Sequence, residues 1–462
     1  MTNKNVYFIG VGGIGMSAIA RHYRALEVDV AGYDRMRSAL TRALEAEGVA
    51  ISYADEPGSI PPQFRDPSRT LVVLTPAIPA DSAILAYFRA GGFRIVKRAV
   101  ALGELTAPFK TYCVAGTHGK TTTSTLVAHI LRNSKVGCSA FLGGISVNYM
   151  TNYWANTSSD AVVTEADEFD RSFLQLSPTA AVITAMDADH LDVYGTHAEV
   201  IKAFLEFAAK VRTGGSLIVK KGLPIGREDV APGVNIVTYA MMDPLADCYA
   251  TGIHDEAGRY VFDIHLPQGV IEGVRLGVPG LHNVENCVAA AALATVAGAS
   301  PSEVTAACAT FRGDKRRFEI WVETNRAMVI DDYAHHPQEI KTTINAVRAL
   351  YRGRKLTVAF QPHLYTRTRD LADDFAEALS LADRVWMLDI YPAREAPIPG
   401  VSSQMLLSKM KPGVGRLSSK ESLADDIVSE DFDIVLIMGA GDIDRLVPAV
   451  AEKVKKVAKT ED

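Results

Sequence analysis

The chain has 462 residues, about three times the roughly 150 residues of a typical domain, so several domains are expected. Its 48% hydrophobic and 22% charged residues are those of a globular protein, and 35 Gly with 21 Pro exclude low-complexity and fibrous classes. The net charge of −6 comes without a long basic block, which argues against non-specific nucleic-acid binding.

The cysteine usage and the N-terminus indicate the compartment. The chain has five widely spaced cysteines without a CxxC pair, Cys113, Cys138, Cys248, Cys287 and Cys308. They predict buried thiols in a reducing environment. The alanine-rich run from Asn286 to Ser302 is too short and too weakly hydrophobic to span a bilayer, and no cleavable apolar segment precedes the first strand. A cytoplasmic protein is therefore expected.

Short apolar runs alternate along the chain with longer stretches of helical periodicity. The runs predict strands at Val6–Ile9, Leu71–Leu74, Ala161–Val163, Ala180–Thr184, Thr357–Phe360 and Ile434–Met438. Their continuous apolarity is typical of parallel strands that are covered on both faces. The fold class is therefore expected to be α/β, built from repeated βαβ units.

The first predicted strand ends in a glycine-rich turn. Gly10, Gly12 and Gly15 form a GxGxxG pattern between this strand and a predicted helix. Such glycines let a diphosphate approach the helix N-terminus, whose amides and dipole favour an anion. Asp34 ends the second strand-like run, where an acid often meets a ribose hydroxyl. The pattern indicates a diphosphate site, NAD being one candidate, and a purely structural turn is the alternative.

A second glycine loop, VAGTHGKTTTS, lies at Val114–Ser124, again between a predicted strand and a predicted helix. Backbone amides around Gly116–Gly119 are expected to cradle phosphates, Lys120 to reach the terminal ones, and the Thr121 hydroxyl to contact magnesium. Val114 occupies the first glycine position of the general phosphate-loop pattern. This departure favours a narrower, family-specific loop.

Two acidic strings follow, VVTEADEFDRSF and AMDADHLDVYG. Glu165 ends one predicted strand and His190 follows another, and α/β sheets gather ligands at the carboxyl ends of their strands. With the Thr121 hydroxyl, they are expected to hold the divalent ion that neutralises phosphates during transfer. The two loops together predict an enzyme that binds ATP at the second loop and a diphosphate-bearing substrate at the first.

With these residues, the chain resembles the Mur ligases of peptidoglycan synthesis over nearly its whole length. The strings that carry the resemblance are GVGGIGMS, GTHGKTTT, EADEFDRSF, DADHLDVYG, GLHNVEN, FRGDKRRFE, DDYAHHP and QPHLYTRTRD. The resemblance implies a ligase that uses ATP and Mg²⁺, with Mn²⁺ as an alternative ion. It would join L-alanine to the carboxylate of UDP-N-acetylmuramate through an acyl phosphate, as a monomer or homodimer without nucleic-acid or membrane partners.

The resemblance also implies three α/β domains. Residues 1–100 would form a Rossmann-like domain that binds the UDP substrate. Residues 101–312 would form a central ATP-binding domain of the P-loop type with a mostly parallel sheet, and residues 313–462 a Rossmann-like domain that completes the ATP site and binds the amino acid. Domain closure is expected, because the ATP contacts would come from the second and third domains.

The family motifs also imply a role for each matching residue. The catalytic residues would be Lys120, Glu165, His190 and Arg317. The UDP substrate would be bound by Gly10, Gly12, Gly13, Ile14, Gly15, Met16, Ser17 and Asp34. ATP would be bound by Gly116, Thr117, His118, Gly119, Lys120, Thr121, Thr122, His282, Asn283, Asn286, Arg317 and Asp332. The amino acid would be bound by Tyr333, His335 and Arg367, and the metal by Thr121, Glu165 and His190.

Two positions depart from the usual family pattern. Leu364 stands where an Arg usually precedes the YTRTRD run, so Arg369 or Arg394 is an alternative partner for the amino-acid carboxylate, and Phe169 replaces a small polar residue. Three other functions stay open: a ligase for a preformed peptide or another acid such as a folate, an NAD-dependent oxidoreductase, and a non-catalytic nucleotide sensor. The amine that supports turnover separates the ligases, and cofactor absorbance would reveal the oxidoreductase.

Overall fold

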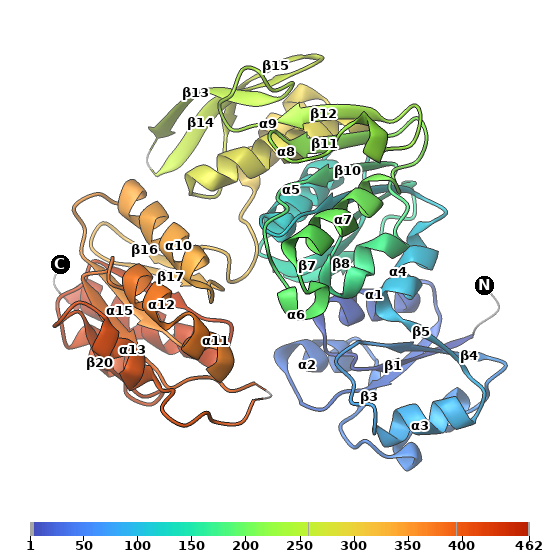
Figure 1. Ribbon diagram of the computed structural model, residues 1–462, viewed down its shortest axis with the longest axis horizontal. Coiled ribbons are helices and arrows are strands. Elements are labelled where there is room, and N and C mark those ends of the chain that lie inside the picture. The colour runs from blue at the N-terminus through green and yellow to red at the C-terminus, as the bar shows by residue number, and fades with distance from the viewer. Residues whose placement is uncertain (1–3, 257, 394, 461–462) are drawn as a thin grey trace. The chain divides into compact units, whose positions relative to one another are not determined.

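The computed structural model describes residues 4–460, apart from residues 257 and 394, and shows a chain of alternating strands and helices (Figure 1). The chain divides into two compact units. Unit 1 contains Met1–Asp255, Tyr260–Val278 and His282–Arg312, and unit 2 contains Glu256–Arg259, Pro279–Leu281 and Gly313–Asp462. Three of the four sheets are mostly or wholly parallel, which confirms the α/β class. The three-domain division stays a prediction.

Unit 1 begins with a five-stranded parallel sheet, drawn in blue in Figure 1. Its strands lie in the order β3 (Ala50–Ser52), β2 (Asp29–Tyr33), β1 (Asn5–Ile9), β4 (Thr70–Leu74) and β5 (Arg94–Lys97). The helices of this part are α1 (Ile14–Ala25), α2 (Ala39–Ala46), α3 (Ala83–Ala90) and α4 (Arg98–Thr106). All residues of β1 are buried, since it is the central strand.

The second sheet of unit 1 has seven strands. They lie in the order β12 (Asn235–Tyr239), β11 (Ser216–Lys220), β10 (Ala180–Ile183), β6 (Lys110–Ala115), β9 (Ala161–Glu165), β7 (Ser139–Ser146) and β8 (Thr151–Trp154). Only the edge strand β8 pairs antiparallel among the described pairings. The helices here are α5 (Lys120–Arg132), α6 (Leu191–Tyr194) and α7 (His197–Ala208). The predicted strands at 161–163 and 180–184 are confirmed as β9 and β10.

A small third sheet follows, with β13 (Tyr249–Glu256), β14 (Arg259–Leu266) and β15 (Gly269–Arg275). The strands β14 and β15 pair antiparallel. Two helices come next in the chain, α8 (Leu281–Ala297) and α9 (Pro301–Thr310). The alanine-rich α8 is buried along most of its length, because its small side chains allow close packing within the core of unit 1.

Unit 2 contains a six-stranded sheet. Its strands lie in the order β16 (Glu319–Glu323), β17 (Met328–Asp332), β21 (Ile434–Met438), β18 (Leu356–Phe360), β19 (Arg384–Met387) and β20 (Gly415–Leu417). Only β16 pairs antiparallel among the described pairings. The helices are α10 (Pro337–Leu350), α11 (Tyr365–Asp370), α12 (Ala372–Leu379), α13 (Ser403–Lys409), α14 (Leu423–Val428) and α15 (Val447–Thr460).

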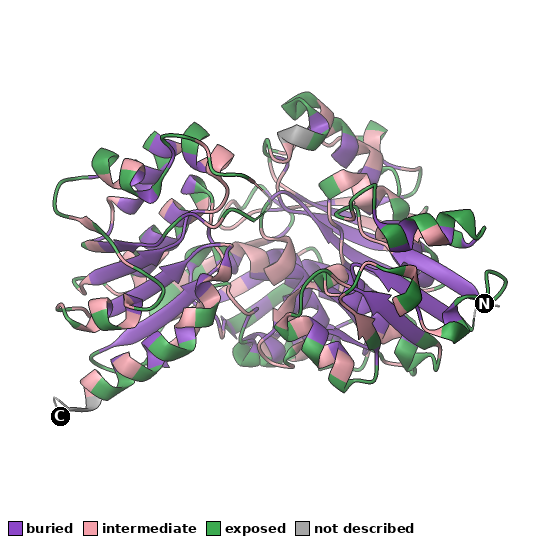
Figure 2. Cartoon of the chain, turned by 90° about the horizontal axis from the view of Figure 1, so that it is seen from below, coloured by how far each residue is buried: buried purple, intermediate pink, exposed green. Residues whose placement is uncertain are grey.

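The central strands of the parallel sheets are buried and the outer faces of helices are exposed, as Figure 2 shows by colour. The five cysteines are buried free thiols, as predicted. Burial raises the pKa of Cys138 and of Cys248 to about 12, which keeps these thiols protonated. In the described part of the chain, no helix combines the length and the apolar character that crossing a membrane requires.

Candidate active site

The first glycine loop connects β1 to α1. Gly10 adopts a φ of +88°, and a side chain there would collide with Thr75, so glycine is required at this turn. The Gly12 amide donates a hydrogen bond of 2.7 Å to Asp34 Oδ2. Asp34 therefore holds the loop itself, and its contact with a UDP substrate stays a prediction.

The start of α1 is fixed by bonds from the seven-stranded sheet. Asn152, fully buried on β8, donates to the Ile14 carbonyl at 2.6 Å and to Ser17 Oγ at 3.1 Å. The side-chain oxygen Oδ1 of Asn152 accepts a hydrogen bond of 2.5 Å from Arg21 Nη1. No side chain among the described residues caps the N-terminus of α1 at Gly13, and the first turn of α1 contains no acidic residue. These bonds leave the helix start available to an anion.

A pocket of about 260 Å³ lies beside this helix start in unit 1. It reaches from the first glycine loop to Glu165 at the end of β9, with Arg98 and Asp167 in its wall. The lining residues are Gly13, Ile14, Gly15, Met16, Ala18, Thr75, Pro76, Ala77, Arg98, Leu102, Phe141, Leu142, Gly143, Thr164, Glu165, Asp167 and Phe169. Four of the predicted UDP-binding residues and the predicted metal ligand Glu165 therefore share one cavity.

The second glycine loop follows β6 and opens α5. Gly116 has a φ of +137° and Gly119 a φ of +77°, in the left-handed region that favours glycine. Lys120 is the first residue of α5, and its Nζ donates to the Gly116 carbonyl at 2.6 Å and to Glu168 Oε1 at 2.9 Å. Thr121 and Thr122 follow in the same helical turn. Lys120 thus joins the loop to the acidic segment after β9.

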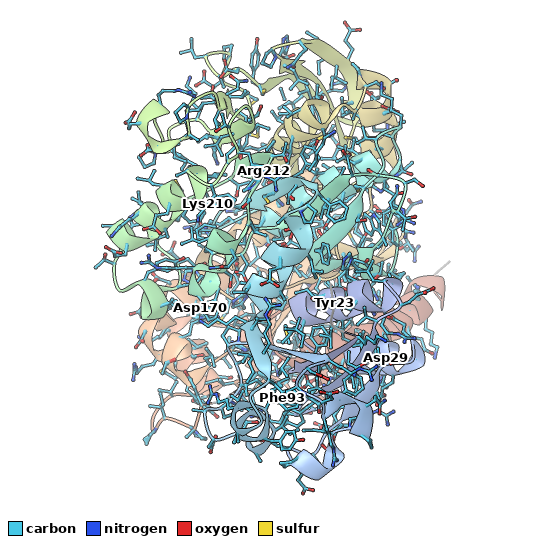
Figure 3. All side chains as sticks on the ribbon, turned by 90° about the vertical axis from the view of Figure 1, so that its right-hand side faces the viewer. Tyr23, Asp29, Phe93, Asp170, Lys210 and Arg212 are labelled. Carbon is cyan, nitrogen blue, oxygen red and sulfur yellow. The ribbon has the colours of Figure 1, made fainter. Side chains whose placement is uncertain are left out.

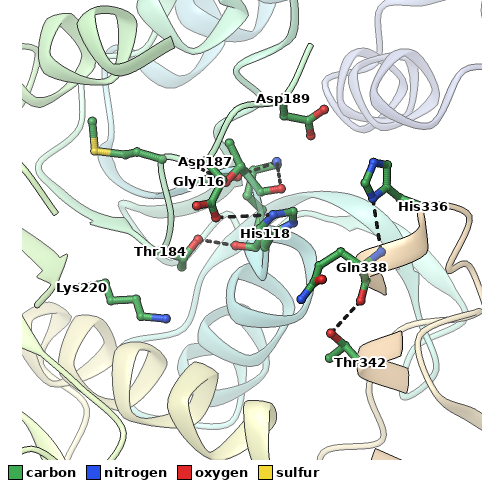
Figure 4. Close-up of polar contacts among 12 residues, drawn as sticks. Gly116, His118, Thr184, Asp187, Asp189, Lys220, His336, Gln338 and Thr342 are labelled. Carbon is green, nitrogen blue, oxygen red and sulfur yellow. Dashed lines mark hydrogen bonds and ion pairs between the residues drawn. The ribbon is translucent and has the colours of Figure 1, made fainter. Parts of the chain in front are cut away.

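The segment after β10 holds the middle of the same loop (Figure 4). The Thr184 hydroxyl donates to the His118 carbonyl, and the His118 ring nitrogen Nε2 lies 3.5 Å from Asp187 Oδ2. The Asp187 amide donates to Thr117 Oγ1 at 3.1 Å. The string AMDADHLDVYG therefore shapes the loop through its backbone as well as supplying His190.

The predicted metal ligand His190 lies beside two carboxylates that sequence reasoning missed. Its Nε2 is 3.8 Å from Glu168 Oε1 and 3.7 Å from Asp189 Oδ2. One ligand atom from each of these three residues lies within 4.8 Å of the others, a spacing that fits one divalent ion bound by oxygen and imidazole ligands. The Phe169 ring packs edge-on against His190 at 5.3 Å. Glu168 and Asp189 belong to the two acidic strings, and this position in the sequence could have marked them as candidate ligands.

Glu165 lies against Gly143 of β7, where a side chain would collide with both of its carboxylate oxygens. Its charge also acts on Lys120. Burial lowers the pKa of Lys120, but the charges of Glu168 and Glu165 and the Glu168 hydrogen bond outweigh burial and raise it. Lys120 is therefore a buried ammonium ion that the two glutamates keep charged.

Three of the predicted ATP-binding residues, His282, Asn283 and Asn286, lie at the start of α8. Asn286 Nδ2 donates to Asn283 Oδ1 at 3.1 Å, as their spacing of one helical turn predicts. A side chain on Gly119 would come within 2.8 Å of Asn286 Oδ1, so this amide lies against the second glycine loop. His282 is exposed. The structure thus brings Asn286 and the second glycine loop together.

Within unit 2, three predicted residues meet at the carboxyl end of β17. Asp332 accepts hydrogen bonds from the Phe318 amide at 2.8 Å and the Ala334 amide at 2.9 Å. Burial raises the pKa of Asp332, against the opposing charge of Arg317. The Arg317 guanidinium lies over the Tyr333 ring, 5.5 Å from its centroid. Arg317, Asp332 and Tyr333 therefore form one cluster.

The predicted amino-acid residues continue this cluster. His335 Nδ1 lies 3.4 Å from Glu339 Oε2. Burial lowers the pKa of His335, Glu339 opposes that effect, and Arg367 adds to it. Arg367 Nη1 is buried and has no hydrogen-bond partner among the described residues. A buried guanidinium nitrogen of this kind suits a ligand carboxylate.

Leu364, which departs from the family pattern, precedes α11 with a φ of +71° and a ψ of 135°. Non-glycine residues adopt this region only when their surroundings impose it. Its amide donates to the Tyr391 carbonyl at 3.0 Å, which holds the turn. Of the two alternative cations, Arg369 pairs with Asp370 at 2.7 Å and is 52% exposed, and Arg394 lies outside the described residues.

Known proteins resemble the chain from end to end. A protein of Porphyromonas gingivalis named UDP-N-acetylmuramate–L-alanine ligase is 49% identical over 450 residues, which cover 97% of this chain and 98% of that protein. Family profiles described as "Mur ligase family, catalytic domain", "Mur ligase middle domain" and "Mur ligase, glutamate ligase domain" match residues 5–110, 114–294 and 316–441. The chain belongs to the Mur ligase family. The resemblance seen in the motifs is thereby confirmed.

Other Mur ligases agree with this placement. A protein of the same name from Phocaeicola vulgatus is 48% identical and covers 98% of this chain and 99% of its own. The crystal structure of UDP-N-acetylmuramate-alanine ligase from Thermotoga maritima matches with a TM-score of 0.83 and 26% identity, covering 98% and 99% of the two chains. A murein peptide ligase from Psychrobacter arcticus, at 22% identity and a TM-score of 0.68, shares the fold.

Proposed function

We propose that this Mur ligase joins L-alanine to UDP-N-acetylmuramate and converts ATP to ADP and phosphate. The names of relatives that are 48–49% identical over nearly the whole chain support this substrate pair. The structural observation that carries the proposal is the pocket that joins the first glycine loop to Glu165. If the diphosphate of the substrate binds at the first glycine loop, the remaining groups of the substrate would lie in the pocket, beside the ATP loop.

In the first step, a carboxylate oxygen of the muramyl group attacks the terminal phosphorus of ATP, and ADP leaves. Lys120 would stabilise the charge that develops on the transferred phosphoryl group, since such transfer depends mainly on positioned cations. His190 and Glu168, with Asp189 next to them, have the spacing to hold Mg²⁺, and Thr121 and Glu165 are the further candidates. When bound, the ion neutralises phosphate charge.

In the second step, the amine of L-alanine attacks the acyl carbon, and the tetrahedral intermediate collapses to an amide and phosphate. Arg367 would bind the alanine carboxylate through its buried Nη1. Tyr333 and His335 would complete this pocket, while Arg317 and Asp332 would contact phosphate and ribose of ATP. A methyl side chain contributes only about 1 kcal/mol to discrimination, so larger amino acids must be excluded sterically. We further propose a cytoplasmic monomer or homodimer.

Phosphate release by the purified protein tests this function, with UDP-N-acetylmuramate, L-alanine, ATP and Mg²⁺ omitted in turn. Release that requires all four is the expected result, with an amide product confirmed by mass spectrometry. Glycine, L-serine and a preformed peptide then replace L-alanine. Faster turnover with the peptide would assign a peptide ligase, and release without any amine would contradict the ligase.

A further inference from the structure

Arg98 occupies an unusual position at the first residue of α4. Its side chain is 17% exposed and lines the pocket, and its Nη2 donates to Asp167 Oδ2 at 3.0 Å. The other charged residues in the pocket wall are Glu165 and Asp167, both acidic. A substrate diphosphate entering this pocket would meet two carboxylates. Arg98 supplies the positive charge that offsets them.

The third glycine of the first loop makes room for this arginine. A Cβ built on Gly15 would lie 2.9 Å from Arg98 Nη1 and 3.1 Å from its Cδ. The φ of Gly15 is not in the left-handed region, so its backbone conformation would accept an alanine. A side chain at this position would therefore displace the Arg98 guanidinium without straining the chain conformation.

The guanidinium and the start of α1 lie at the same place. Gly15 belongs to the first turn of α1, which has no side-chain cap and no acidic residue. Uncapped amides and a helix dipole favour an anion there. A guanidinium in contact with that turn adds charge-assisted hydrogen bonds to phosphate oxygens.

We propose that Arg98 binds the diphosphate of the UDP substrate together with the start of α1, and that Gly15 is glycine to admit the arginine side chain. The proposal rests on the proposed function and adds to it a binding residue outside the glycine loop. The Asp167 carboxylate then orients Arg98 in the pocket. Because Asp167 lies two residues after Glu165, the same arginine connects the diphosphate to the acidic segment of the ATP site.

Calorimetric titration of the full-length protein with UDP, with UDP-N-acetylmuramate and with ATP tests this assignment. For Arg98→Ala we expect both uridine ligands to bind about 10- to 100-fold more weakly, the range for a lost charge-assisted contact, and ATP to bind within about threefold of wild type. Gly15→Ala should weaken UDP about 10-fold in wild type and less than about twofold in the Arg98→Ala background. Lys97→Ala is the matched control, because this exposed neighbour forms its ion pair with Asp170, labelled in Figure 3, away from the residues that line the pocket.

Three results would overturn the assignment. They are unchanged UDP binding by Arg98→Ala, an equal loss for UDP and ATP, or a loss for UDP-N-acetylmuramate alone, which would place Arg98 on the carboxylate. If Arg98→Ala does not fold, Arg98→Lys and Asp167→Asn replace it. UDP binding that is unchanged in both of these variants would reduce Arg98 to a structural role. A wild-type protein that binds no uridine ligand would contradict the proposed function instead.

Discussion

The buried ion pair between Lys120 and Glu168 allows a quantitative test of the packing around the second glycine loop. The Glu168 side chain is 1% exposed, that of Lys120 is 15% exposed, and the charged atoms are 2.9 Å apart. Removing one partner of a buried pair leaves the other charge uncompensated, which costs about 3–5 kcal/mol. Glu168→Gln keeps the shape and removes the charge. We expect it to lower the free energy of unfolding by about 3 kcal/mol.

The expected thermal shift follows from this value. The entropy of unfolding is about 2.1 cal/mol/K per residue, so for unit 1, with its roughly 300 residues, a loss of about 3 kcal/mol should lower the melting temperature by about 5 °C. Without Glu168, the largest charge that opposes the effect of burial is gone, so the pKa of Lys120 should fall relative to its raised value in wild type.

A double-mutant cycle with Lys120→Met provides the assay. Calorimetry of wild type, both single variants and the double variant should give a coupling energy of about 2 kcal/mol or more, because the double variant buries no unpaired charge. Asp160→Asn breaks the exposed Lys110–Asp160 pair and should cost less than about 1 kcal/mol. Additive effects, with Glu168→Gln within about 1 kcal/mol of wild type, would refute the reasoning.

Three further predictions concern the loop lysine, the acid at β9 and a buried acid of unit 2. Lys120→Ala should lower turnover about 100- to 1,000-fold while UDP still binds, and equal losses in kcat and UDP affinity would argue against separate sites. Gly143→Ala should displace Glu165 and lower turnover about 100-fold, whereas Gly58→Ala, with open space around it, should leave turnover unchanged in the same phosphate-release assay. Burial, opposed by Arg316, raises the pKa of Asp331 to about 7, so the folded state holds this proton more tightly than the unfolded chain. Stability should therefore fall by up to about 4 kcal/mol between about pH 4 and pH 7, and denaturant midpoints of Asp331→Asn should lack that slope.

Local patterns were sufficient for the strands and for both glycine loops. The predicted strands at 6–9, 71–74, 357–360 and 434–438 differ from β1, β4, β18 and β21 by at most one residue at each end. A buried parallel strand needs a continuous apolar run, and a phosphate loop needs glycines at backbone positions that other residues rarely adopt. Both requirements concern residues that are consecutive in the chain, so the sequence shows them directly.

The partners of charged side chains could not be read in the same way. Glu165 and Glu168 stand three residues apart in one string, and the sequence favoured Glu165 alone. In the structure, Glu168 pairs with Lys120, and the chain then turns at Asp170 and Arg171, which both adopt a φ of +53°. Asp34, at the end of the second strand-like run, was predicted to contact the UDP substrate. In the structure it accepts a hydrogen bond from the Gly12 amide of the first glycine loop.

The amino-acid sequence alone determines the α/β class, the family, the two glycine loops and the residues that mark them. Only the tertiary structure decides which side chains meet, such as Arg98 with Gly15 and Asp167, or Glu168 with Lys120 and His190. Backbone preference and apolar periodicity act between neighbours in the chain, so they are visible in a single sequence. Ion pairs and pocket walls join residues that are tens of positions apart, and their geometry exists only after the sheets and helices have packed.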